Sequence, residues 1–199
     1  MKKYILLFLI FSSINILGQI KSGEYEDGLN LAYNKKTNRL TGYFESYTGY
    51  DEETKDSKFS CIFYIEFQHK KNKIEITTYF PKHKEEDIIK GEFRIIKPTQ
   101  IQIKLEDEHG GCWNVQHFND KLETFNLDTE KKWIEIRYIN IPKSYFYSEK
   151  NEISKQRAFL IKGDVIFIDT IDGNWVHCIY KGKKITQGWI KLDELNTLQ

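Results

Sequence analysis

Apolar and polar residues alternate along most of the chain after Gln19. The stretch 59–67, FSCIFYIEF, carries the strongest alternation, and the stretches 73–80, 101–105 and 132–139 repeat it. Because successive side chains of a strand point to opposite faces, this pattern predicts strands that each bury one face. In the first stretch the expected buried face consists of Phe59, Cys61, Phe63, Ile65 and Phe67.

Polar, turn-forming segments separate these strands at intervals of about ten residues. A convincing helical stripe is missing from the sequence, and the best candidate, 82–91, is short and ends at Gly91. The sequence therefore predicts an all-β fold. Its first part should be an antiparallel meander, closed as a barrel or folded as a sandwich.

The alternation weakens at 140–144, NIPKS. Pro142 cannot donate a hydrogen bond to a neighbouring strand, so it is expected to interrupt the sheet. This predicts a first domain over 19–141 and a second, smaller domain over 142–199.

The second of these domains resembles the bacterial SH3-like domains that are appended to many secreted proteins and cell-wall enzymes. The resemblance rests on YFYSE (145–149), LIKGDVIFI (160–168), DGNWVHCIYKGK (172–183) and GWIKLDEL (188–195). It implies a small SH3-like barrel, although the Asn-x-Arg signature that usually opens such domains is absent. The first domain has a looser resemblance to calycin-type barrels, in GEYEDGLNL (23–31) and RLTGYFE (39–45).

The chain begins with a segment typical of secretion, MKKYILLFLIFSSINILGQ. Two lysines precede an apolar run that is too short to span a bilayer, and Gly18 offers a cleavage point. We therefore expect a signal peptide over 1–18 and a periplasmic or extracellular protein, with a short membrane anchor as the alternative. Elsewhere the sequence has no stretch that is long and apolar enough to cross a membrane.

Charge argues against a nucleic-acid partner. The chain has 30 Lys and Arg against 29 Asp and Glu, a formal net charge of +1. Acids and lysines are interleaved, whereas electrostatic binding to nucleic acid needs a clustered basic surface. The densest basic run, HKKNK (69–73), is expected to be an exposed hairpin tip.

Three cysteines are present, and an oxidising compartment raises the question of their pairing. Cys61 lies on the apolar face of a strong strand, and Cys112 follows a Gly-Gly turn that can adapt to disulfide geometry. We predict a Cys61–Cys112 disulfide, with two buried thiols as the alternative. Cys178 is expected to pack in the core of the second domain.

The segment 106–118, EDEHGGCWNVQHF, is the strongest candidate for chemistry. As a metal site it would use His109, Cys112 and His117, but the last two would point to opposite faces of a strand. As a nucleophile, Cys112 would be surrounded by acids that raise the pKa of its thiol. We predict a disulfide-stapled turn instead, from which Trp113 or Val115 returns to the core. The sequence thus predicts no catalytic residue, metal ion or cofactor.

Clustered aromatic residues are the remaining candidates for binding. The stretch 41–51, TGYFESYTGYD, and the second domain both carry them, and flat rings suit extended peptides and sugars. The alternative in each case is an aromatic row in the core. The candidate binding residues are Tyr43, Tyr47, Tyr50, Tyr147, Trp175 and Trp189.

Together these features favour a secreted or periplasmic, non-catalytic binding protein. The resemblance implies that the SH3-like domain docks on cell-wall peptide or on a protein partner. One alternative is an immunity or inhibitor protein against a secreted, cell-wall-degrading toxin, since a rigid scaffold loses little entropy on binding. Another is a carrier whose barrel holds a small apolar ligand, which requires an internal cavity. An enzyme is the least favoured class.

Overall fold

The computed structural model of the protein describes residues 20–70 and 73–198. The expected signal peptide over 1–18 lies outside the described residues. Strands and four short 3₁₀ helices make up the secondary structure of the described part, so the predicted all-β fold is confirmed. Among these residues, no helix has the length and apolar character needed to cross a membrane.

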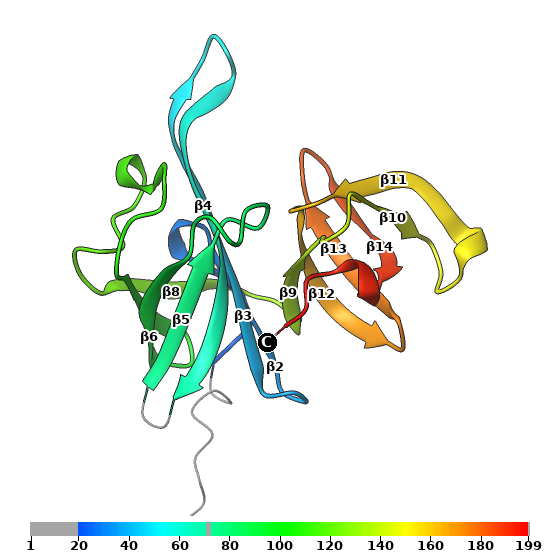
Figure 1. The fold of residues 1–199 in the computed structure, drawn as a ribbon, viewed down its shortest axis with the longest axis horizontal. Coiled ribbons are helices and arrows are strands. Elements are labelled where there is room, and N and C mark those ends of the chain that lie inside the picture. The colour runs from blue at the N-terminus through cyan, green and yellow to red at the C-terminus, as the bar shows by residue number, and fades with distance from the viewer. Residues whose placement is uncertain (1–19, 71–72, 199) are drawn as a thin grey trace, which may run out of the picture.

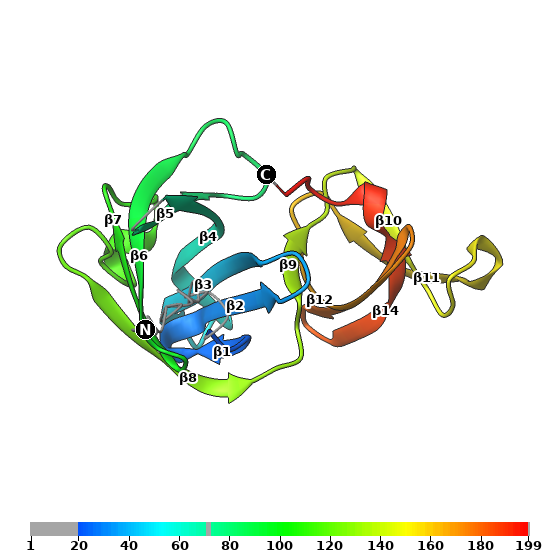
Figure 2. The same ribbon diagram turned by 90° about the horizontal axis from the view of Figure 1, so that it is seen from below.

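The first part of the chain is a closed antiparallel barrel of eight strands (Figures 1 and 2). Neighbouring strands in the barrel are consecutive in sequence, and β1 pairs with β8 to close it. The predicted meander is therefore confirmed, and it forms a barrel rather than a sandwich. The strands are β1 (Gly23–Tyr25), β2 (Leu29–Asn34), β3 (Arg39–Asp51), β4 (Asp56–Lys70), β5 (Lys73–Tyr79), β6 (Ile89–Lys97), β7 (Gln100–Leu105) and β8 (Glu123–Glu130).

Aromatic rings fill the interior of the barrel. Phe44 stacks on Phe63 with ring centroids 5.1 Å apart, and Phe118 meets Phe44 edge-on at 4.9 Å. Phe118 comes from the long connection between β7 and β8, which therefore inserts a side chain into the core. These rings occupy the space inside the barrel that a carrier would need for an apolar ligand.

The β3–β4 hairpin is longer than the other hairpins and projects beyond the barrel (Figure 1). Cys61, Phe63 and Ile65, on the predicted apolar face of β4, are fully buried. Phe59 lies on the same face but is 40 % exposed. The projecting part of the hairpin therefore leaves an apolar face without a covering layer.

The second part of the chain is a curved six-stranded sheet, in the order β11-β10-β14-β13-β12-β9 (Figure 2). A separate core, which includes Phe146, Ile166, Val176 and Ile190, lies inside the curve. After a 3₁₀ turn at Leu192–Glu194, Leu195 forms a bridge with Ile139. The strands are β9 (Glu135–Tyr138), β10 (Lys143–Tyr147), β11 (Lys155–Ile161), β12 (Val165–Asp172), β13 (Trp175–Lys181) and β14 (Ile185–Lys191).

The two sheets divide earlier in the chain than the boundary predicted at 142. Strand β9 pairs with β12, in the register Val165↔Tyr138, and so belongs to the second sheet. The division falls between Glu130 and Glu135, at the end of β8. Alternation in 132–139 correctly indicated a strand, but alternation does not identify the strand that it pairs with.

A buried interface joins the barrel to the second sheet. Tyr64 of β4 donates a hydrogen bond from its hydroxyl to the backbone oxygen of Ile136, at 2.7 Å. The backbone N–H of Ile136 donates to Oγ1 of Thr41, at 2.8 Å. One apolar cluster contains Ala32, Tyr43, Tyr64 and Tyr79 from the barrel and Trp133, Ile136, Tyr138, Val165 and Phe167 from the second part.

Lys181 of β13 reinforces this interface from its edge. Its Nζ lies 2.6 Å from a carboxylate oxygen of Glu24 in β1, and 4.5 Å from the centroid of the Trp133 ring. Burial alone would raise the pKa of Glu24, but hydrogen bonds from Lys181 and Lys131 outweigh it and lower that pKa. The barrel and the second sheet thus share both an apolar core and a charged contact.

Candidate functional site

The segment 106–118 is a stapled turn, as the sequence predicts. Cys112 opens the 3₁₀ helix η3 (Cys112–Asn114) and forms the predicted disulfide with Cys61, which is 51 residues away in sequence. Cys178 is a buried thiol, and burial raises its pKa. Of the two residues expected to return to the core, Val115 packs against it, whereas Trp113 is 65 % exposed.

His109 anchors the same segment inside the protein. Its Nδ1 lies 2.6 Å from a carboxylate oxygen of Asp87, and its Nε2 lies 2.8 Å from Oγ1 of Thr78. The order hydroxyl, imidazole, carboxylate is that of a hydrolase triad. Thr78, however, is fully buried, and its hydroxyl donates to the backbone oxygen of Ile89 at 3.0 Å. A substrate cannot reach this hydroxyl, so the arrangement holds the turn in place.

The three candidate metal ligands of this segment do not converge. Cys112 is in the disulfide, His109 is directed to Asp87 and Thr78, and His117 lies beside Glu108 and Trp113. Across the described residues there is no group of three or more His, Cys, Asp and Glu side chains placed to hold a metal ion. The segment therefore supports neither metal binding nor cysteine catalysis.

The Gly-Gly pair provides a matched test of how the turn is built. Gly111 has φ +89°, and an added Cβ would lie 2.2 Å from the backbone oxygen of Ser60. We expect Gly111→Ala to lower the free energy of unfolding by at least about 2 kcal/mol, because strain and a steric clash combine. Nothing lies within 4 Å of the corresponding position at Gly110. Gly110→Ala should therefore change stability by less than about 0.5 kcal/mol, and equal effects in urea unfolding would contradict this account of the turn.

The second sheet brings together the three aromatic residues that the sequence singles out there. Tyr147 of β10 pairs with Trp189 of β14, and the Tyr147 and Trp175 rings meet edge-on at 5.0 Å. His177 packs against Trp189 with centroids 5.3 Å apart. Tyr147 is only 7 % exposed, whereas both tryptophans are half-buried. We call Tyr147, Trp175, His177 and Trp189 the aromatic face.

Charged side chains border the aromatic face. Nζ of Lys150 lies 5.4 Å from the centroid of the Trp189 ring and contacts the carboxylate of Asp172. Lys191, the β14 partner of Trp175, pairs with Glu152 at 2.5 Å. Rings with polar groups around them can offer an extended ligand both stacking area and hydrogen-bond partners.

The aromatic candidates of the barrel are not gathered in the same way. Tyr43 is 7 % exposed and belongs to the interface with the second sheet. Tyr47 and Tyr50 lie on the projecting β3–β4 hairpin, 51 % and 63 % exposed. Trp113 is close to this hairpin, because the hydroxyl of Thr48 donates to the backbone oxygen of the next residue, Asn114, at 2.9 Å. The exposure of Trp113 was not predicted from the sequence.

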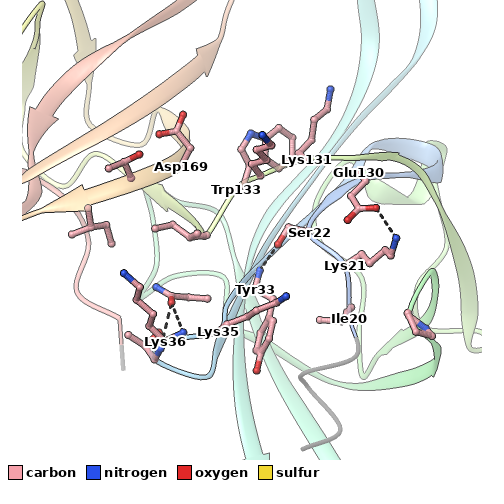
Figure 3. A pocket seen from close by; sticks show the side chains of 17 residues that line it. Ile20, Lys21, Ser22, Tyr33, Lys35, Lys36, Glu130, Lys131, Trp133 and Asp169 are labelled. Carbon is pink, nitrogen blue, oxygen red and sulfur yellow. Dashed lines mark hydrogen bonds and ion pairs between the residues drawn. The ribbon is translucent and has the colours of Figure 1, made fainter.

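A cleft of about 970 Å³ lies where the chain crosses from the barrel to the second sheet (Figure 3). Five separate segments line it: the residues just before β1, the end of β2 with the turn after it, Pro98 between β6 and β7, the connection from β8 to β9, and the end of β12. Its charged lining residues are Lys21, Lys35, Lys36, Glu130, Lys131, Lys132 and Asp169. No pattern in the sequence predicts this cleft.

No protein-family model, curated protein or solved structure matches the chain. Its function must therefore be argued from the geometry of its own residues.

Proposed function

We propose that this chain is a non-catalytic binding protein of the cell envelope, whose second sheet is an SH3-like module that docks on cell-wall peptide. The observation that carries the proposal is the aromatic face, where Trp175 and Trp189 are half-buried and packed around Tyr147. Half-buried, well-packed rings give contact area to an extended ligand without a large loss of side-chain entropy.

Two further observations support the proposal. The Cys61–Cys112 disulfide fits the oxidising conditions outside the cytoplasm, where a protein with a cleaved signal peptide would work. The residues that sequence analysis considered for catalysis in the segment 106–118 are held in structural contacts, with His109 and Cys112 both buried. Binding is then the chemistry that the exposed side chains of the second sheet serve best.

Co-sedimentation with purified peptidoglycan tests the proposal. The protein comprising residues 19–199 should pellet with the wall, and the Trp175→Ala/Trp189→Ala variant should lose at least about tenfold in affinity, as expected for central aromatic anchors. Trp113→Ala is the matched control, because it removes an exposed tryptophan from the barrel. Circular dichroism should show the native fold in all variants.

The same experiment tests two claims separately: that the protein binds the cell wall, and that the aromatic face makes the contact. If the wild-type protein stays in solution, wall binding is wrong. If it pellets but the double variant pellets equally well, the aromatic face is not the contact.

The second candidate function is inhibition of a secreted, cell-wall-degrading toxin. The observation that favours it is the β3–β4 hairpin, which projects from the barrel with Tyr50 and Phe59 exposed. Four acidic residues at or near its tip, Asp51, Glu52, Glu53 and Asp56, suit a basic cleft on a protein partner. This candidate becomes the better one if the protein fails to pellet with the wall.

A further inference from the structure

The cleft between the barrel and the second sheet combines an excess of positive charge with an apolar floor. Five lysines line it against two carboxylates, which leaves three positive charges. The entire sequence has a formal net charge of only +1. Lysines and acids are balanced over the chain as a whole, so the excess at this one concave place is a local feature.

The two carboxylates of the cleft already have partners. Glu130 pairs with Lys21 at 2.6 Å, and both carboxylate oxygens of Asp169 lie 3.0 Å from Nδ1 of His177. Within residues 20–70 and 73–198, no acidic group lies within ion-pair distance of Lys35, Lys36 or Lys132. These three lysines are exposed at the rim and remain available to an anionic ligand.

The floor of the cleft is apolar. Trp133 and Tyr33 are buried in it, and the more exposed Ile134 and Ile171 form part of its wall on the side of the second sheet. A volume of about 970 Å³ is at the upper end of the range for ligand pockets. The cleft therefore has room for several residues of an extended chain rather than for a single small ion.

The cleft also adjoins the aromatic face. Asp169 lines the cleft and contacts His177, whose ring packs against Trp189. On the neighbouring strands, Thr170 of the cleft is the register partner of His177. A ligand that lies on the aromatic face can thus extend into the cleft without leaving the surface of the second sheet.

We propose that this cleft binds an acidic peptide, with its carboxylates on Lys35, Lys36 and Lys132 and an apolar residue against Ile171. The inference rests on the proposed function. It adds a second contact with the wall peptide, in which lysines of the cleft bind the carboxylates of the peptide. Lysine ammonium groups act as point charges and suit several separated carboxylates. The apolar floor favours a peptide over a fully polar anion.

Calorimetric titration with a synthetic stem peptide tests this proposal. The probe is L-Ala-γ-D-Glu-meso-diaminopimelyl-D-Ala, and the control probe is the same peptide with its carboxylates amidated. We expect Lys35→Gln/Lys36→Gln/Lys132→Gln to bind the acidic probe about tenfold more weakly than the wild-type protein, from three modest charge contacts. The affinity of the wild-type protein should also fall as salt rises, because exposed charges are screened.

Matched variants separate a specific effect from a general loss of charge. Lys55→Gln/Lys183→Gln/Lys184→Gln removes three exposed lysines outside the cleft and should change the affinity less than twofold. Amidation of the probe should weaken binding to the wild-type protein, but should add little to the loss in the cleft variant. Ile171→Ser should weaken binding of both probes about equally, since it removes an apolar contact.

The outcomes distinguish failure of the cleft proposal from failure of the proposed function. If the cleft and control variants bind the acidic probe alike, the cleft proposal is overturned and wall binding through the aromatic face still stands. The same holds if the protein pellets with peptidoglycan but does not bind the probe. If the protein neither pellets nor binds the probe, both proposals are overturned.

Discussion

Replacing Cys61 and Cys112 together by alanine is expected to lower the free energy of unfolding by about 4 kcal/mol. The bond closes a loop between residues 51 apart in sequence, and a loop of this length restricts the unfolded chain by about that amount. Both cysteines are fully buried, so the substitutions also remove packed atoms from the core. Urea unfolding followed by circular dichroism measures the loss.

Reduction of the wild-type protein provides the control. Unfolding in the presence of a reductant should shift the midpoint nearly as far as the double substitution does. Cys178→Ala should cost about 1–2 kcal/mol from packing alone and should keep the full response to the reductant. An unfolding midpoint that does not move on reduction would show that the disulfide contributes nothing to stability.

Loss of the disulfide is also expected to weaken the packing of the connection between β7 and β8. Cys112 holds the segment that also contributes His109 and Phe118 to the interior of the barrel. Without the disulfide, this segment relies on Gly111 packed against β4 and on the hydrogen bonds of His109. The staple and the buried histidine therefore stabilise the same connection between β7 and β8.

Local alternation predicted most strands of this protein, because a strand with one buried face reveals itself within a few residues. The stretch 59–67 is an example, with Cys61, Phe63 and Ile65 fully buried as expected. The strand with which it pairs, in contrast, cannot be predicted from the few residues of the strand itself. The stretch 132–139 shows this, because its strand pairs with β12 and not with the barrel.

The candidate site was predictable only in part, for the same reason. Trp175 and Trp189 come together with Tyr147 because β13, β14 and β10 are neighbours, and the sequence pattern identified these residues as candidates without giving that order. Tyr43 and Tyr47 share one side of β3, yet the second sheet covers only Tyr43. Sequence periodicity identifies the two sides of a strand, but not what packs against each.

The cleft lay beyond sequence analysis altogether. Its lining comes from segments around residues 21, 35, 98, 131 and 170, which no motif connects. Lysines at these positions resemble the many exposed lysines elsewhere in the chain. Only the docking of the second sheet on the barrel gathers them around one apolar floor.

The second large loss of stability is expected from substitution of Tyr64, in the interface between the barrel and the second sheet. This residue is fully buried in the interface, where its ring lies edge-on to Tyr138 at 5.2 Å and its hydroxyl donates to Ile136. Burial also raises the pKa of its hydroxyl, which keeps the group neutral. Tyr64→Ala should lower the free energy of unfolding by about 4 kcal/mol, through the lost ring and the cavity that it leaves.

Tyr64→Phe separates the hydrogen bond from the ring. It keeps the ring and removes the donor to the backbone oxygen of Ile136, so we expect a loss of about 1–2 kcal/mol. If both variants cost the same, packing of the ring would contribute nothing to the interface.

The Tyr64 variants also show whether the barrel and the second sheet unfold together. Three of the four tryptophans, Trp133, Trp175 and Trp189, lie in the second sheet or its approach, whereas Tyr64 is in the barrel. If the shared core couples the two sheets, tryptophan fluorescence and circular dichroism should give one coincident transition in urea, and Tyr64→Ala should lower both midpoints equally. A fluorescence transition that stays in place while the circular dichroism transition moves would mean that the second sheet is stable without the barrel. The cleft would then lie between two independent bodies, and the binding of a peptide across it would depend on their docking.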